Sequence, residues 1–173
     1  TDGRRKLVVT TVVSSSLLSR MARDRGVVCR ETLTGFKWIV DAAMRGEREG
    51  LAFVLGYEET LGYTVGPLVR DKDGIGAALR LAELARFLKT GGETLLDRLE
   101  DLLVAHGLSH QVQWSVVLPG AEGRARIDAA MAQLRASPLG RIGASAVVRV
   151  LDAAEGEERV PGERLPSGLP PSD

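Results

Sequence analysis

Hydrophobic residues in the first third of the chain form runs that alternate between strand-type and helix-type spacing. The β-branched run at 7–13 and the apolar runs at 27–31 and 51–55 predict strands. Between them, apolar residues at helical spacing predict helices over 17–26 and 36–46, each ending at a glycine. Strand, helix, strand, helix, strand is typical of an α/β fold, in which a mostly parallel sheet is flanked by helices on right-handed crossovers.

A glycine-containing stretch separates this pattern from two amphipathic helices. Residues 56–70 hold three Gly and one Pro and are predicted to be irregular. The first helix is predicted over 73–91, with Asp71 or Asp73 as its N-cap, and the second over 94–105.

The pattern changes again near residue 108. Alternating apolar residues predict a strand over 111–118, helical spacing follows over 121–136, and another strand is predicted over 142–151. We therefore predict two domains, a partial α/β domain at 1–107 and an incomplete α+β C-terminal domain at 108–173.

The end of the chain has little apolar material to pack. Residues 155–173 hold four Pro and three Gly, which suits either a flexible, disordered tail or an inter-strand loop of a longer chain. The chain also begins with a strand only six residues in. Both features favour a chain that is truncated at each end.

Charge and cysteine content limit the classes of function. The chain has 23 Lys and Arg against 23 Asp and Glu, so its net charge is zero and no basic surface for nucleic acid or membrane is expected. A single Cys rules out an internal disulfide and any multi-cysteine metal site. No apolar run is long enough to span a bilayer. These features predict a reduced, soluble, cytoplasmic protein.

Few residues suggest catalysis by themselves. His106 and His110 lie at a predicted helix end and strand start, where a capping or surface role is expected. Cys29 falls within a predicted strand and is interpreted as a small core residue. The serines at 14–16 lack a supporting His or Asp and are interpreted as helix caps. Neither a phosphate-binding Walker loop nor a dinucleotide-binding glycine fingerprint is present.

Two loops instead suggest a binding site. Residues 32–37 and 56–63 each follow a predicted parallel strand, so both are expected at the carboxyl edge of the sheet, where α/β proteins bind ligands. Glu58 and Glu59 could accept hydrogen bonds from vicinal hydroxyls, and the Thr60 hydroxyl can donate and accept, which suits a polyol such as a sugar.

Structural roles for the same loop residues stay open. One glutamate could cap a helix or pair with Arg70 or Lys72. These two cations precede a helix N-terminus, the unfavourable end for positive charge, so they are expected to face an anion unless they form a plain surface cluster.

Three short motifs follow one another along the first part of the chain. They are Thr-Gly-Phe-Lys-Trp at 34–38, Gly-Tyr-Glu-Glu-Thr-Leu-Gly-Tyr at 56–63 and Arg-Asp-Lys-Asp-Gly at 70–74. Together they resemble the α-D-phosphohexomutase superfamily, and within it the bacterial phosphoglucomutase/phosphomannomutase branch. In that family the first motif is similar to a Thr-Gly-aromatic-Lys-aromatic loop, the second to the sugar-recognition loop, and the third to the entry to the following helix. This resemblance implies that the chain covers most of the third domain of such an enzyme and the start of the fourth.

The resemblance implies roles for individual residues. Glu58 and Thr60 would contact sugar hydroxyls, with Thr60 at a position where the family usually has serine. Thr34 and Gly35 would contact the sugar or its phosphate. Lys72 would lie near the reacting group, as a catalytic residue that assists proton transfer.

The resemblance also implies the reaction of an intact parent enzyme. Such enzymes interconvert sugar 1-phosphate and 6-phosphate through a phosphoserine and a sugar bisphosphate, which also serves as activator, and they use Mg²⁺. The phosphoserine, metal and phosphate loops do not occur in this sequence. We therefore expect no metal ligand here, partners that are a sugar phosphate and the remaining domains of the parent, and no activity of these residues alone. The alternative is a non-catalytic α/β module that binds sugar or protein. The motifs leave open whether glucose, mannose or pentose phosphate is preferred.

Overall fold

The computed structural model describes residues 3–160 and 163–166 of the chain. The chain divides into two compact units, Thr1–Gln111 and Val112–Asp173. The predicted domain limits at residues 107 and 108 remain predictions. Within the part that the structure describes, we find no helix that combines the length and apolarity required to cross a bilayer.

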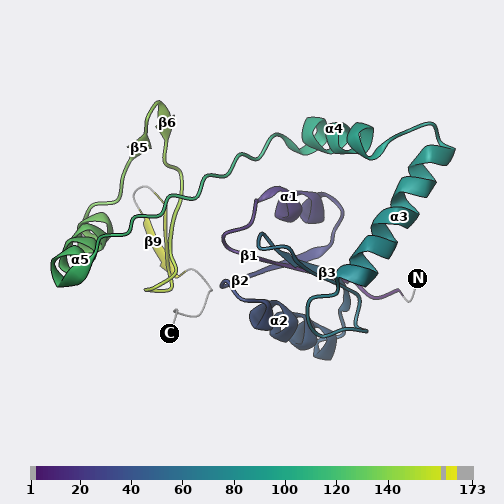
Figure 1. The fold of residues 1–173 in the computed structure, drawn as a ribbon, viewed down its shortest axis with the longest axis horizontal. Coiled ribbons are helices and arrows are strands. Elements are labelled where there is room, and N and C mark those ends of the chain that lie inside the picture. Colours follow the sequence, from purple (N-terminus) through teal and green to yellow (C-terminus); the bar gives the residue numbers. More distant parts are fainter. Residues whose placement is uncertain (1–2, 161–162, 167–173) are drawn as a thin grey trace. The chain divides into compact units, whose positions relative to one another are not determined.

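A four-stranded sheet in the order β2-β1-β3-β4 forms the centre of the first unit (Figure 1). β1 (Lys6–Thr11) pairs in parallel with both β2 (Val28–Thr32) and β3 (Ala52–Glu58). β4 (Gly62–Val65) joins β3 as an antiparallel edge strand. The predicted mostly parallel sheet is therefore confirmed.

The first two helices cover opposite faces of this sheet. Figure 1 shows α1 (Leu17–Asp24) on one face and α2 (Phe36–Arg48) on the other. The chain runs from β1 to β2 in one direction, and from β2 past β1 to β3 in the other. Two right-handed crossovers in opposite directions place their helices on opposite faces, which explains this layering.

The core lies between α2 and the sheet. Ile39 is fully buried, and a Cβ added to Gly56 of β3 would lie 2.5 Å from its Cγ2 atom. The helix thus rests almost on the strand backbone, and only glycine leaves room for this approach. The residues buried together in this cluster are Leu7, Val9, Phe36, Ile39, Ala42, Ala43 and Phe53.

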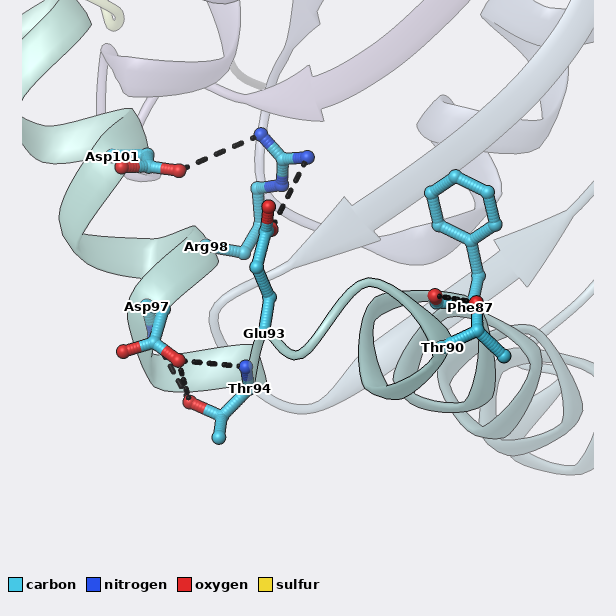
Figure 2. Close-up of polar contacts among 7 residues, drawn as sticks. All are labelled: Phe87, Thr90, Glu93, Thr94, Asp97, Arg98 and Asp101. Atoms are coloured by element: carbon cyan, nitrogen blue, oxygen red, sulfur yellow. Dashed lines mark hydrogen bonds and ion pairs between the residues drawn. The ribbon is translucent and has the colours of Figure 1, made fainter.

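Two further helices complete the first unit, and both begin with a side-chain cap. α3 (Gly74–Thr90) starts at Asp73, whose carboxylate accepts a 2.8 Å hydrogen bond from the Gly76 amide, so one of the two predicted caps is confirmed. α4 (Leu95–His106) starts with a capping box between Thr94 and Asp97 (Figure 2). In the same view, Arg98 lies between the carboxylates of the flanking Glu93 and Asp101.

One local expectation in this unit was wrong. The segment predicted to be irregular, 56–70, contains the end of β3 and all of β4, which form a hairpin. The short Gly-Tyr-Thr-Val strand has too weak a pattern by itself, and pairing with β3 stabilises it.

The serines predicted to cap the first helix do lie at its start. Ser16 is the N-cap of α1, although its own side chain makes no capping bond. The Ser15 hydroxyl accepts a hydrogen bond from the Leu17 amide at 3.1 Å.

The second unit contains one helix and short antiparallel strands. Arg135, in the last turn of the helix, donates a 2.6 Å hydrogen bond to Asp152, and this bond holds the pKa of the Asp152 carboxyl below its usual value. The elements are α5 (Gly120–Ala136), β5 (Arg141–Ile142), β6 (Ser145–Ala146), β7 (Val150–Asp152), β8 (Glu157–Val160) and β9 (Glu163–Pro166).

The strand predictions for the second half need correction. Residues 111–118 form no strand, because alternating apolar residues make a strand only where a partner strand supplies hydrogen bonds. Trp114, in the middle of this segment, is 89% exposed. The single strand predicted at 142–151 is split among β5, β6 and β7. The Pro/Gly-rich end, predicted as tail or loop, contributes β8 and β9, while 161–162 and 167–173 lie outside the described residues.

The α4 capping box predicts an acid-sensitive helix. Hydrogen bonds from the Thr94 side chain and backbone lower the pKa of Asp97 from its usual 3.8. A lowered carboxyl pKa stabilises the folded state above pH about 4, and this contribution is lost as the pH falls through the folded pKa. We expect amide exchange protection of Thr94, Asp97 and Arg98, whose N–H groups make the hydrogen bonds of the cap, to fall on acidification in the wild type. Asp97→Asn should begin with less protection and change less with pH.

A neighbouring carboxylate provides the control for this measurement. Asp101→Asn removes an acidic group that pairs with Arg98 at 3.8 Å and takes no part in the cap. Its exchange should keep the acid dependence of the wild type. An unchanged acid response in Asp97→Asn would contradict the capping argument.

Candidate functional site

The carboxyl ends of the three parallel strands meet at one edge of the sheet. The loops that leave β1, β2 and β3 therefore lie at the same edge, as predicted for the two loops that leave β2 and β3. The start of α3 is brought to this edge as well, because the Asp73 amide donates a hydrogen bond to the Tyr63 carbonyl at 2.5 Å. All three sequence motifs thus reach one region of the surface.

Glu58 ends β3 with its side chain packed against the protein. Its residue is only 5% exposed, although it carries a carboxylate. A Cβ added to Gly62, its partner in the hairpin, would lie 2.8 Å from Glu58 Oε1 and 2.8 Å from Phe36 Cδ2. Glycine at this position therefore makes the space in which the carboxylate and the Phe36 ring lie together.

Lys72 completes this arrangement with a positive charge. Its Nζ atom lies 3.5 Å from Glu58 Oε1 and 4.7 Å from the centroid of the Phe36 ring. The ammonium offsets the cost of burying the carboxylate, and the Phe36 ring face stabilises the ammonium in this position. Asp71 accepts a 2.8 Å hydrogen bond from the Lys72 amide, and Asp73 caps the next helix, so the backbone on both sides of Lys72 is held.

The other predicted site residues lie nearby in the loops. Gly35 is the N-cap of α2 and has φ of 122°, a positive value that favours glycine. Thr34, which precedes it, is exposed. Thr60 is exposed at the hairpin tip. Arg70 points elsewhere: it pairs at 2.7 Å with Glu47 near the C-terminal end of α2. Both cations of the Arg-x-Lys motif therefore face carboxylates of this chain.

The β1 loop adds contacts that sequence reasoning missed. The Ser15 amide donates a hydrogen bond to Glu59 Oε1 at 3.3 Å, and the Thr10 hydroxyl donates to the Tyr57 carbonyl at 3.2 Å. Both bonds join the end of β1 to the β3–β4 hairpin. The sequence did hold a signal for these contacts, because Thr10 and Ser14 are hydroxyl residues at the end of an apolar strand. In the structure both residues are buried.

Comparison with known proteins agrees with this geometry. The family profile described as phosphoglucomutase/phosphomannomutase, alpha/beta/alpha domain III, matches residues 2–105, more than half of the chain. The chain belongs to this family.

Individual relatives support the same assignment. The phosphoglucomutase of Staphylococcus aureus strain USA300 is 34% identical over 135 residues, covering 78% of this chain and 24% of the relative. That of strain MSSA476 is 33% identical over the same length. A crystal structure from Thermus thermophilus, assigned as a phosphomannomutase, superposes with a TM-score of 0.51 at 26% identity, over 61% of this chain and 22% of that one. The chain thus spans about a quarter of the length of the curated relatives it matches.

His106 makes its polar contacts away from the sheet edge of this phosphoglucomutase/phosphomannomutase domain that holds Glu58. His106, at the end of α4, has its Nδ1 atom 2.8 Å from Asp24 Oδ2 and its Nε2 atom 3.3 Å from the Arg25 guanidinium, both at the end of α1. Its side chain is only 6% exposed and its ring joins two helices, so His106 makes an interhelical contact in place of the predicted capping or surface role.

The described residues of this family member show no metal-binding cluster. Over 3–160 and 163–166, no group of three or more His, Cys, Asp or Glu side chains is placed to hold an ion. We therefore assign none of these described residues to the Mg²⁺ that the family resemblance implies.

Cys29 of the phosphoglucomutase/phosphomannomutase domain should react slowly. It lies half-buried in β2, and burial, assisted by the charge of Glu31, raises its thiol pKa from 9.0 to about 11. Because the thiolate is the nucleophile, alkylation by iodoacetamide at pH 8 should be about 100-fold slower in the folded than in the urea-unfolded chain. The folded rate should then rise about tenfold per pH unit up to pH 11. Equal rates in both states would show that the thiol is not protected.

Proposed function

We propose that this chain supplies the sugar-recognition domain of a phosphosugar mutase. The intact enzyme would interconvert hexose 1-phosphate and 6-phosphate by phosphoryl transfer, in the cytoplasm, with a phosphoserine and a sugar bisphosphate as intermediates. The observation that carries this proposal is the convergence of Glu58, Phe36 and Lys72, one from each of the three motifs, at the carboxyl edge of the sheet.

Glu58 is the proposed acceptor for sugar hydroxyls. Its carboxylate is almost fully buried, so it needs a partner at all times, and in this structure that partner is Lys72. Vicinal hydroxyls can replace the ammonium, because each donates one hydrogen bond to a carboxylate oxygen. Lys72 is half exposed and long enough to move toward the ligand as the sugar takes its place.

The remaining roles follow from position. The exposed Thr60 hydroxyl can donate to one sugar oxygen and accept from another. Thr34 and Gly35 precede the N-terminus of α2, where free amide groups favour a phosphate. A displaced Lys72 ammonium can stabilise the phosphate or pass a proton to the reacting oxygen, which would make it the catalytic residue of this domain. Phosphoryl transfer also needs a nucleophile and Mg²⁺, and we assign these to the remaining domains of the parent.

The binding role predicts a large effect of Glu58. Glu58→Gln removes the charge but keeps the size of the side chain. Hydrogen bonds to charged groups contribute about 1.5–3 kcal/mol, so the Kd for glucose 6-phosphate should rise at least about tenfold. A titration of the full chain followed by amide NMR shifts would measure this change.

Glu83→Gln is the matched control for this titration. Glu83 is exposed on α3 and pairs with Arg80 at 2.7 Å. This variant should bind like the wild type. Equal affinity of Glu58→Gln and wild type would remove the basis of the proposed function.

The same proposal predicts no turnover by this chain alone. A domain that recognises the sugar without the nucleophile cannot transfer a phosphoryl group. A coupled assay with glucose 1-phosphate, glucose 1,6-bisphosphate and Mg²⁺ should therefore stay at background. Turnover above background that is lost in Glu58→Gln would show that these residues are sufficient for catalysis.

A further inference from the structure

We propose that Glu59 is a positioning residue for sugar recognition, which ties the hairpin tip to the β1 loop and thereby sets where Thr60 presents its hydroxyl. This inference rests on the proposed function. It assigns a separate task to the second glutamate of the loop: Glu58 binds the sugar, and Glu59 holds the loop that does so.

The contact crosses the place where an α/β sheet binds its ligands. The loops from β1 and β3 leave neighbouring strands, and α1 and α2 lie on opposite faces, so the ends of these two strands form the switch point of the sheet. The hydrogen bond from the Ser15 amide to Glu59 Oε1, at 3.3 Å, bridges these two loops. It joins residues 44 positions apart in the sequence.

The donor side of this contact is held firmly. The Ser14 amide donates to the Thr11 carbonyl at 2.9 Å, which makes a tight turn, and the buried hydroxyls of the same two residues lie 2.9 Å apart. The Ser15 hydroxyl accepts from the Leu17 amide at 3.1 Å. The Ser15 N–H is thus fixed beside the N-terminus of α1, whose dipole also favours a carboxylate there.

The acceptor side needs such support. Glu58 pairs with Gly62, so the hairpin tip has only three residues, Glu59, Thr60 and Leu61. Leu61 has φ of 62°, in the left-handed region, which is sterically unfavourable for a residue with a Cβ atom. Its side chain is 78% exposed and returns little burial energy. The bond to Ser15 is therefore a restraint on a tip that would otherwise relax.

Thr60 is the middle residue of the hairpin tip, between Glu59 and Leu61. Glu59 is anchored to the β1 loop on one side, and Leu61 is held in the left-handed region on the other. The distance from the Thr60 hydroxyl to the Glu58 carboxylate is then fixed, which allows the pair to discriminate between sugars that differ in one hydroxyl. Loss of the bond between Ser15 and Glu59 should weaken sugar binding and reduce the preference between such sugars, while the domain stays folded.

The experiment measures binding to the full chain and its Glu59 variants. For Glu59→Ala we expect the Kd for glucose 1-phosphate to rise about three- to tenfold, the effect of one hydrogen bond. Its preference for glucose 1-phosphate over galactose 1-phosphate should shrink by a similar factor. Glu59→Gln keeps the acceptor oxygen and should stay within about twofold of the wild type in both measurements.

A second variant tests the contact from the other side. Ser15→Pro removes the N–H donor and leaves Glu59 intact, but it also removes the hydroxyl that accepts from the Leu17 amide, so Ser15→Ala, which lacks only the hydroxyl, is its control. Ser15→Pro should reproduce the effect of Glu59→Ala, and the double variant should be no worse than either single one, because both changes remove the same bond. Thermal unfolding decides whether Ser15→Pro is folded, and if it is not, Glu59→Ala and its rescue by glutamine carry the test.

The outcomes separate this inference from the proposed function. Binding that depends on Glu58 but not on Glu59, or a loss in Glu59→Gln as large as in Glu59→Ala, overturns the positioning role and leaves the proposed function standing. Binding that is insensitive to Glu58 overturns the proposed function, and the positioning role fails with it. Rescue by glutamine, with unchanged unfolding temperature, supports the inference.

Discussion

The parallel pairing of β1 with both β2 and β3 organises everything that follows from this fold. It brings three strand ends to one edge of the sheet, and the antiparallel β4 returns the chain from that same edge. Residues that are far apart in the sequence then share one surface. Glu58, Lys72 and Phe36 meet because strand direction, and not sequence proximity, decides which loops are neighbours.

The main chemical feature of this edge is a buried carboxylate, that of Glu58. Glu58 is shielded by the hairpin glycine and by the Phe36 ring, and its negative charge is balanced by Lys72. Such a charge is stable only while it is paired, so the site can exchange one partner for another but cannot stand empty. This property suits a site that binds hydroxyl groups, since a ligand replaces an internal contact and does not strip water from an exposed ion.

Relationship to known proteins gives this geometry a context. The family match over 2–105 covers the whole sheet, both flanking helices and almost all of α4. The contacts of the β1 loop with the hairpin extend the site beyond the three motifs that carry the resemblance. Ser15 and Glu59 belong to different loops, and their contact exists only because β1 and β3 are adjacent in the sheet.

Sequence alone determined the α/β class, the order along the chain of the first three strands and first two helices, a helix cap at either Asp71 or Asp73, and the residues of the three motifs, because these depend on local spacing and local hydrogen bonds. Tertiary structure decided the rest. The β3–β4 hairpin forms because β3 offers a partner to the weakly patterned 62–65, whereas 111–118, whose alternation predicted a strand, pairs with no strand in the described part of the chain and forms none. Likewise, Lys72 pairs with Glu58 while Arg70 turns to Glu47, a choice between two neighbouring cations that depends on which carboxylate the fold brings within reach.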